Sequence, residues 1–172
     1  MSTIRTRNLS PVKRKLAKAF CQFALAKFMP RVHHEIVVTI KGSNLLEKSA
    51  MYADVIYEDN EPYREFTLRI DNEQSNEMFI RTLAHEVTHI KQWVKREMRL
   101  NERTGLVRFG KKHYSRDMDY NEMPWEVEAH GREYGLYNQF VEAFPDIGVL
   151  IDESVTDYKL CGSGQMVFKF GR

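Results

Sequence analysis

Residues 83–90 read LAHEVTHI and place His85, Glu86 and His89 close together in the chain. Two histidines four residues apart on a helix point the same way, so both imidazoles can bind one zinc ion. The carboxylate of Glu86 can then accept a proton from a water molecule beside the metal. The H-E-x-x-H spacing therefore predicts a zinc site (Zn2+) with His85 and His89 as ligands and Glu86 as general base, and peptide-bond hydrolysis is the leading hypothesis.

The helix that must carry this motif is predicted from about Asn72 to Arg99, with Asp71 or Asn72 as its N-cap. An apolar stripe runs along it, formed by Ile80, Leu83, Val87, Ile90 and Val94. At about 100° per residue, the two histidines lie nearly opposite this stripe. We therefore expect a core face on one side of the helix and a histidine face on the other.

A catalytic zinc site takes three protein ligands, so one must come from outside the motif helix. The best source is residues 124–130, PWEVEAH, at the start of a helix predicted from Pro124 to about Phe144, where Pro145 stops it. Glu126 is the preferred ligand. Glu128 lies about 200° around the helix from Glu126 and is expected to be a surface or supporting carboxylate. Glu128 and His113 remain the alternatives.

The charge that develops during hydrolysis needs a hydrogen-bond donor besides the metal. Tyr134 is the first choice, because it falls on the same stripe of the third helix as Glu126 and His130. Tyr120, Tyr114 and His113 are the other candidates. Predicted site residues are therefore Glu86 and Tyr134 for catalysis, and His85, His89 and Glu126 for the metal.

The motif followed by residues 126–130 resembles the gluzincin metallopeptidases, in which a downstream glutamate on a second helix completes the zinc site. Residues 124–129 are also similar to small SprT-like and minimal gluzincin proteins of phages and mobile elements. The resemblance covers about residues 66–134. It differs at His130, where the family often has an aspartate that orients the first zinc histidine. SprT-like proteins usually take a third histidine as ligand, which keeps His113 open.

The remaining segments complete an α+β prediction. Ser10 and Pro11 begin a helix that reaches about Phe28, and a hairpin is expected within residues 106–114. Three strand-like runs, read as an antiparallel meander, and a strand in the tail are also predicted: Glu35 to Lys41, Met51 to Tyr57, Tyr63 to Ile70 and Gln165 to Phe170. Tyr63 to Ile70 is expected to be the sheet edge that pairs with an extended substrate.

With the resemblance, these elements imply a zincin-like α+β fold. It comprises an N-terminal helix, a small antiparallel or mixed sheet, a central H-E-x-x-H helix packed on the sheet and a further helix with the third ligand. One domain is expected over residues 1–172, with the motif-bearing core at about 66–144.

The composition favours a globular protein over secreted disulfide-rich and membrane-spanning classes. Hydrophobic residues make up 42% and charged residues 29% of the 172, as in ordinary globular proteins. Two cysteines, Cys21 and Cys161, cannot form a disulfide framework, and neither a signal-peptide core nor a membrane span is recognisable. We expect a cytoplasmic protein (the host cytoplasm if it is phage-encoded) that acts on a protein or peptide substrate.

The competing hypothesis is a non-catalytic interaction or DNA-binding domain that zinc only stabilises. Its support is the basic first helix, with Lys13, Arg14, Lys15 and Lys18, although a solvated helix face is the favoured interpretation. A net charge of +2 does not argue for nucleic acid by itself.

Overall fold

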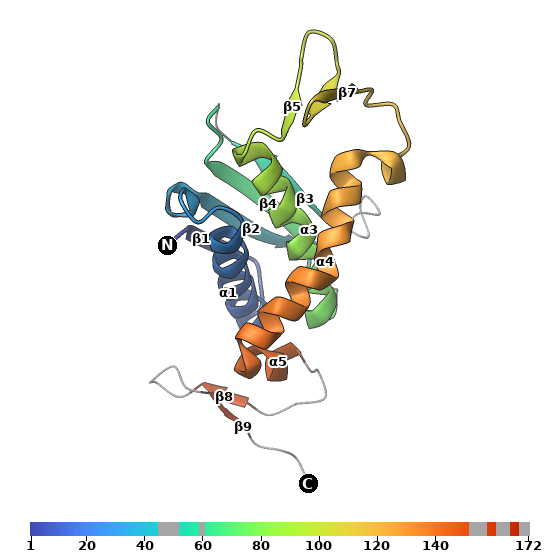
Figure 1. Ribbon diagram of the computed structural model, residues 1–172. Coiled ribbons are helices and arrows are strands. Elements are labelled where there is room, and N and C mark those ends of the chain that lie inside the picture. Colours follow the sequence, from blue (N-terminus) through green and yellow to red (C-terminus); the bar gives the residue numbers. More distant parts are fainter. Residues whose placement is uncertain (45–51, 59–60, 152–157, 161–165, 169–172) are drawn as a thin grey trace.

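A four-stranded sheet with helices on one face forms the body of the protein, and a smaller three-stranded sheet projects from one end (Figure 1). The computed structural model describes residues 1–44, 52–58, 61–151, 158–160 and 166–168. The larger sheet has the order β1-β2-β4-β3. Its strands are β1 (Thr3–Arg7), β2 (Val37–Ser43), β3 (Ala53–Tyr57) and β4 (Glu65–Asp71). The predicted α+β class is confirmed.

The sheet is mixed, and the predicted antiparallel meander is wrong. β1 pairs with β2 and β2 with β4 in parallel, and only β3 pairs with β4 antiparallel. The N-terminal strand β1 was not predicted, because its sequence TIRTR has one strongly apolar residue. β4 lies between β2 and β3, so the run from Tyr63 to Ile70 is not the expected edge. The edge strand on this side is β3.

Helix α1 (Pro11–Phe28) begins and ends as predicted. The side chain of Ser10 accepts a hydrogen bond from the backbone N–H of Lys13, and Pro11 occupies the first helical position, where its missing N–H costs nothing. α1 connects β1 to the parallel strand β2, with the short 3-10 helix η1 (His33–Glu35) before β2.

The motif helix α3 (Asn76–Val94) is shorter than predicted. Its N-cap is Ser75, whose side chain accepts a hydrogen bond from Met78 N–H, whereas Asp71 and Asn72 belong to the end of β4 and the turn after it. At the other end, residues 98–100 form strand β5 (Met98–Leu100). From Phe79 to Gln92 all residues except Arg81 are buried, so α3 is enclosed on every side.

The chain between α3 and the next long helix makes the small sheet β5-β6-β7. The predicted hairpin is present as β6 (Val107–Phe109) and β7 (Lys112–Tyr114), turning at Gly110 with a positive φ of 59°. After the 3-10 helix η2 (Tyr120–Glu122) comes α4 (Pro124–Ala143), close to its predicted bounds. Pro145 ends α4 and also begins a short helix, α5 (Pro145–Ile151).

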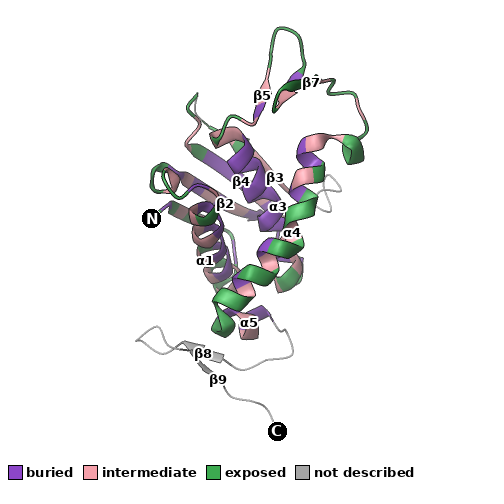
Figure 2. Cartoon of the chain, in the orientation of Figure 1, coloured by how far each residue is buried: buried purple, intermediate pink, exposed green. Residues whose placement is uncertain are grey.

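The main core lies between the larger sheet and α1, α3 and α4, where Figure 2 shows the buried residues gathered. Alternate residues of β2 and β4 enter it, including Val38, Ile40, Phe66 and Leu68, as expected for a sheet with one covered face. No helix of the described residues has the length and apolar character that a membrane-spanning segment needs. In the tail, β8 (Tyr158–Leu160) pairs with β9 (Met166–Phe168), within the predicted run; Gln165, residues 169–170 and Cys161 lie outside the described residues.

Candidate metal centre

Two packed helices bring together the side chains of a compact cluster. His85 and His89 stand one turn apart on the middle of α3, and Glu126 stands in the first turn of α4. Pro124 fixes the beginning of α4, so the position of Glu126 follows from the helix start. All three residues are buried, each with 8% of its surface exposed.

The three inward-facing atoms of this cluster lie almost equally far apart. His85 Nε2 is 3.0 Å from His89 Nε2 and 3.1 Å from Glu126 Oε2, and His89 Nε2 is 3.4 Å from Glu126 Oε2. Ligands at zinc distances of about 2.0–2.1 Å in a tetrahedron are roughly 3.3–3.4 Å apart. The cluster is therefore already close to the size that such an ion requires, and these residues could hold a metal ion.

The outer nitrogen of each histidine is held by a hydrogen-bond acceptor. His85 Nδ1 is 3.1 Å from Glu133 Oε1, and His89 Nδ1 is 2.9 Å from Gln92 Oε1. A carboxylate and an amide oxygen can only accept, so in the neutral rings both Nδ1 atoms carry the hydrogen. Both Nε2 lone pairs then face Glu126 Oε2 with no hydrogen between them. Three acceptors pointing at one another require a cation, which is what a metal site provides.

The pKa values of His85 and Glu126 also indicate that the cluster requires a positive charge. Burial favours the neutral form of His85, but hydrogen bonds to Glu126 and Glu133 outweigh it and raise the pKa of His85 to about 9. Burial would raise the pKa of Glu126, yet hydrogen bonds from His85, His89 and Tyr120 hold it well below its usual range. Without a metal, a proton on the imidazoles supplies the cation that the carboxylate needs.

Glu86 is buried beside the cluster, with 5% of its surface exposed. Burial raises the pKa of Glu86 to about 7, against the opposing effect of the charges of His89 and His85. The negative charges of Glu126 and Asp54 raise the pKa of Glu86 further. A carboxyl group with this pKa can take up and release a proton near neutral pH, as a general base must.

Tyr120 reaches the cluster from η2. Its hydroxyl donates a hydrogen bond to Glu126, and partial burial of this residue, which is 49% exposed, together with the bond raises the pKa of Tyr120 well above its usual range. The hydroxyl also lies 3.5 Å from His130 Nε2. Tyr120 therefore stays protonated and can act as a hydrogen-bond donor beside the three ligand atoms.

The first-choice donor, Tyr134, does not join the cluster. It is 57% exposed, and the guanidinium of Arg81 lies 3.8 Å from the centre of its ring. Eight residues along an α-helix turn it about 80° from Glu126, enough to move Tyr134 off the buried face. Among the described residues no hydrogen bond joins Tyr134 to His85, His89 or Glu126.

The two alternative ligands also lie elsewhere. His113 is exposed on β7, opposite Arg108 of β6, and belongs to no metal-binding group of the described residues. Glu128 turns to the other side of α4, where Oε1 is 2.6 Å from Lys91 Nζ and Oε2 is 3.1 Å from Gln92 Nε2. Glu128 thus has the supporting role expected of it.

Two residues of the site were missed by the sequence analysis, Glu133 and Gln92. Glu133, rather than the residue at position 130, holds the first histidine: its Oε1 accepts from His85 Nδ1 and, at 2.7 Å, from His130 Nδ1. Glu133 follows Glu126 by seven residues, or two helical turns, so it lies on the same face. Gln92 follows His89 by three residues on the histidine face of α3. These spacings along the two helices were the signal by which Glu133 and Gln92 could have been found in the sequence.

The chain matches no protein-family model, and comparisons with curated proteins and with solved structures find no significant similarity. What can be said of the site therefore comes from its own geometry.

Proposed function

We propose that this protein is a zinc-dependent peptide hydrolase whose metal ligands are His85, His89 and Glu126. One observation carries the proposal: three buried acceptor atoms converge within 3.0–3.4 Å while both histidines donate through their outer nitrogens. Glu86, a carboxyl group poised to exchange a proton, stands beside them. The proposal includes the resemblance to gluzincins, in which a downstream glutamate on a second helix completes the zinc site.

Zinc is the metal that suits the donor set best. Two imidazole nitrogens and one carboxylate oxygen are the ligands of one class of catalytic zinc site, which leaves a fourth position free. When bound, zinc would lower the pKa of a water molecule and polarise the carbonyl of the scissile bond. The protein groups then have to move protons and stabilise charge.

Glu86 would accept the proton of the attacking water and deliver it to the nitrogen of the leaving amine. Its burial keeps the carboxyl group in a water-poor setting, where its pKa is suited to both steps. Tyr120 would donate its hydroxyl hydrogen to the oxygen on which negative charge develops. Tyr120 replaces Tyr134 in this role because it, and not Tyr134, hydrogen-bonds to Glu126.

The edge strand β3 would hold the backbone of an extended substrate. Within the described residues β3 hydrogen-bonds only to β4, and α3 packs over both strands. The charge of Asp54 on β3 contributes to the raised pKa of Glu86, which is consistent with an edge strand on the side of the proposed general base. Addition of a strand gives affinity through main-chain hydrogen bonds with little demand on sequence.

Metal analysis together with a peptide-hydrolysis assay tests the proposal. Purified protein should hold one zinc per chain and cleave unstructured peptides until a chelator is added. Glu86→Gln should lower kcat/KM by at least about a hundredfold, because a general base contributes roughly 10²–10⁴-fold, and should leave the zinc content unchanged. Glu77→Gln is the matched control, since Glu77 is a half-exposed carboxylate on the same helix.

The competing zinc-stabilised interaction domain gives a different result. There the zinc content would be the same, no peptide would be cleaved, and Glu86→Gln would change nothing measurable. Protein that binds no zinc, or cleavage that survives Glu86→Gln, would contradict the proposed function.

A further inference from the structure

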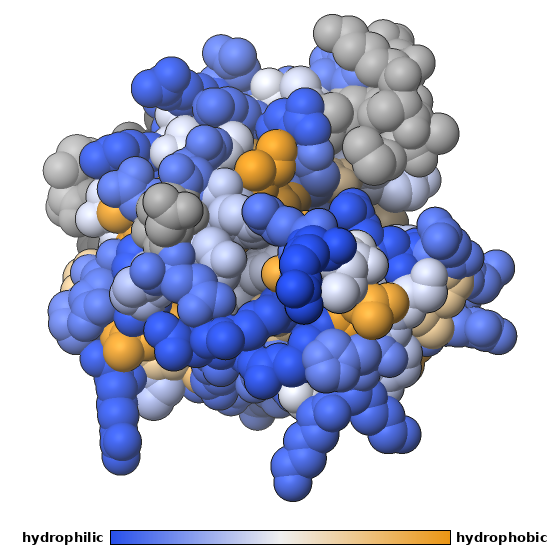
Figure 3. Space-filling view, turned by 90° about the horizontal axis from the view of Figure 1, so that it is seen from above, coloured by the Kyte–Doolittle hydropathy of each residue, from blue (hydrophilic) through white to orange (hydrophobic). Residues whose placement is uncertain are grey.

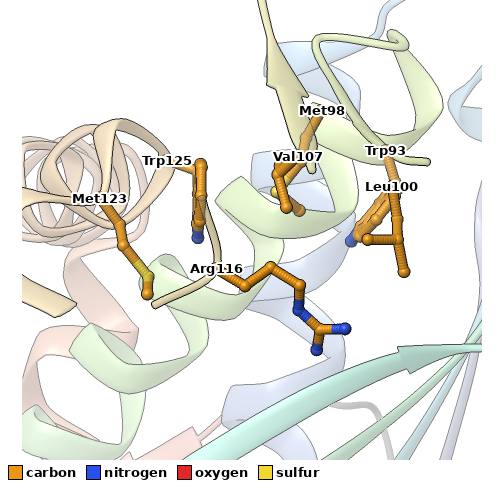
Figure 4. A pocket seen from close by; sticks show the side chains of 7 residues that line it. All are labelled: Trp93, Met98, Leu100, Val107, Arg116, Met123 and Trp125. Carbon is orange, nitrogen blue, oxygen red and sulfur yellow. The ribbon is translucent and has the colours of Figure 1, made fainter. Parts of the chain in front are cut away.

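A cavity of about 290 Å³ opens between the end of α3, the small sheet and the start of α4. Figure 4 shows Met123 and Trp125 on one side, and Trp93 with residues of the small sheet on the other. The described residues of the lining are apolar except for one arginine: Trp93, Met98, Leu100, Val107, Arg116, Met123 and Trp125. The guanidinium of Arg116 extends along the edge of the space between the two sides (Figure 4).

Two of the residues that line this cavity, Trp93 and Trp125, are close in the chain to residues of the candidate metal centre. Trp93 follows His89 by one helical turn on the same side of α3, a rise of about 6 Å. Trp125 directly precedes Glu126 on α4. Gln92 joins the two walls, because its Oε1 is 2.9 Å from His89 Nδ1 and its Nε2 donates to the backbone oxygen of Trp125 at 2.9 Å.

Among the described residues that line the cavity, Arg116 is the only charged one. It is exposed, and in the described part of the chain it makes no ion pair. A guanidinium is a bidentate donor that matches the two oxygens of a carboxylate. The cavity thus offers an apolar space and one positive group at its edge, which suits a ligand with an apolar body and a carboxylate.

The cavity is sized for a single side chain. About 290 Å³ is at the lower limit of ordinary ligand pockets.

Seen from the side of the small sheet, the surface is mostly hydrophilic, and hydrophobic residues appear only in small separate patches (Figure 3). A broad apolar patch, as expected for a protein-docking face, is not seen on this side.

We infer that this cavity binds the apolar side chain of the last residue of a peptide, while Arg116 binds its terminal carboxylate. The inference rests on the proposed function and specifies its substrate class. The bond cleaved would be the amide before that residue. Water adds its hydroxyl to the carbonyl carbon and its remaining hydrogen to the nitrogen, so the products are a shortened peptide with a new carboxylate and one free apolar amino acid.

Binding can be measured without any catalysis. The chain has two tryptophans, Trp93 and Trp125, and both line the cavity, so their fluorescence reports its occupation directly. N-acetyl-phenylalanine, excited where only tryptophan absorbs, should change this fluorescence and should bind about tenfold more tightly than its carboxamide. Arg116→Gln should abolish that difference. Arg103→Gln, which removes the same charge from the exposed turn before β6, should keep it.

Cleavage supplies the second measurement. The zinc-loaded protein should release phenylalanine from acetyl-Ala-Ala-Phe about tenfold faster in kcat/KM than it cleaves the C-terminal amide or acetyl-Ala-Ala-Asp. Arg116→Gln should remove the preference for the free carboxylate.

The outcomes separate the two proposals. Cleavage of internal bonds with no preference for a free apolar C-terminus overturns the inference and leaves the hydrolase proposal standing. Carboxylate-selective binding that depends on Arg116, without any cleavage, supports the ligand class and counts against the hydrolase. Equal binding of acid and carboxamide, or no fluorescence change with either, overturns the inference.

Discussion

Glu133 is the residue on which the orientation of the first histidine depends, and its replacement gives the sharpest test of the metal centre. Its Oε1 accepts from His85 Nδ1 at 3.1 Å and so keeps the Nε2 lone pair directed at His89 and Glu126. Glu133→Gln preserves the size and an acceptor oxygen but removes the negative charge. It also leaves Arg81, whose Nη2 is 3.7 Å from Glu133 Oε2, with a less neutralised charge near the site.

The expected loss can be stated as an affinity. Replacing the carboxylate partner of a metal-binding histidine costs about 10–100-fold in metal affinity, or about 1.4–2.8 kcal/mol. We expect a loss in this range for Glu133→Gln and a larger one for Glu133→Ala, which also removes the acceptor. Competition with a zinc-binding dye at fixed pH and salt measures both values.

Glu142→Gln is the matched control, because Glu142 is an exposed carboxylate on the same helix and its replacement changes the net charge equally. Its zinc affinity should equal that of the parent protein. If Glu133→Gln also binds zinc within about twofold of the parent, the Nε2 atoms of His85 and His89 do not depend on Glu133 for their orientation, and they do not form the pre-arranged acceptor cluster inferred from the structure.

Three other predictions concern stability and reactivity. Zinc at about a hundred times its dissociation constant should stabilise the fold by about 2.7 kcal/mol and raise Tm by about 5–11 °C, an effect reversed by chelator; a Tm indifferent to both would contradict the site. Glu128→Gln should cost about 1–3 kcal/mol in urea unfolding, because it weakens the pairing of the buried Lys91, whose other ion pair among the described residues is with Glu97. Hydrogen bonds from Lys91 and other groups outweigh burial and lower the pKa of Glu128 to about 2. A lowered pKa stabilises the fold above the unfolded value, so the difference between parent and variant should vanish as the pH falls from about 4.5 to about 2, and a difference that persists there would contradict this origin. Burial raises the pKa of Cys21 to about 12, so in a Cys161→Ser background alkylation should occur only on unfolding; fast reaction of the native protein would contradict the burial of α1.

Helices were the most predictable part of the fold, because each signal for them is local. Ser10 and Pro11 mark the start of α1, and Pro124 marks that of α4. The sheet was less predictable, since parallel pairing joins strands far apart in the sequence and leaves no local mark. β1 shows this best: its alternation is supported only by Ile4, and its place becomes evident only when β2 lies beside it.

The candidate site also has a part with local sequence signals and a part that depends on contacts between distant segments. Spacing put His85 and His89 on one helix and favoured Glu126, on the next long helix, over Glu128 and His113 as third ligand, and the structure brings these three together. It could not place Tyr120 or Glu133, because each depends on how η2 and α4 approach α3. Tyr134 was misplaced because a separation of eight residues was treated as sharing a face, whereas eight residues rotate the side chain about 80° from Glu126, and Tyr134 packs on Arg81 at the outside of α3.

The small sheet between α3 and α4 has a consequence for the chain as a whole. An ion held by His89 and Glu126 would close a ring of 37 residue steps. Closing a flexible loop of that length costs about 3 kcal/mol of chain entropy, apart from a constant. The pairing of β5, β6 and β7 already orders residues 98–114 of this loop. Much of the chain entropy is therefore lost on folding, before any ion binds. The small sheet thus shortens the flexible part of the chain between His89 and Glu126 and helps to position Glu126 as the third ligand.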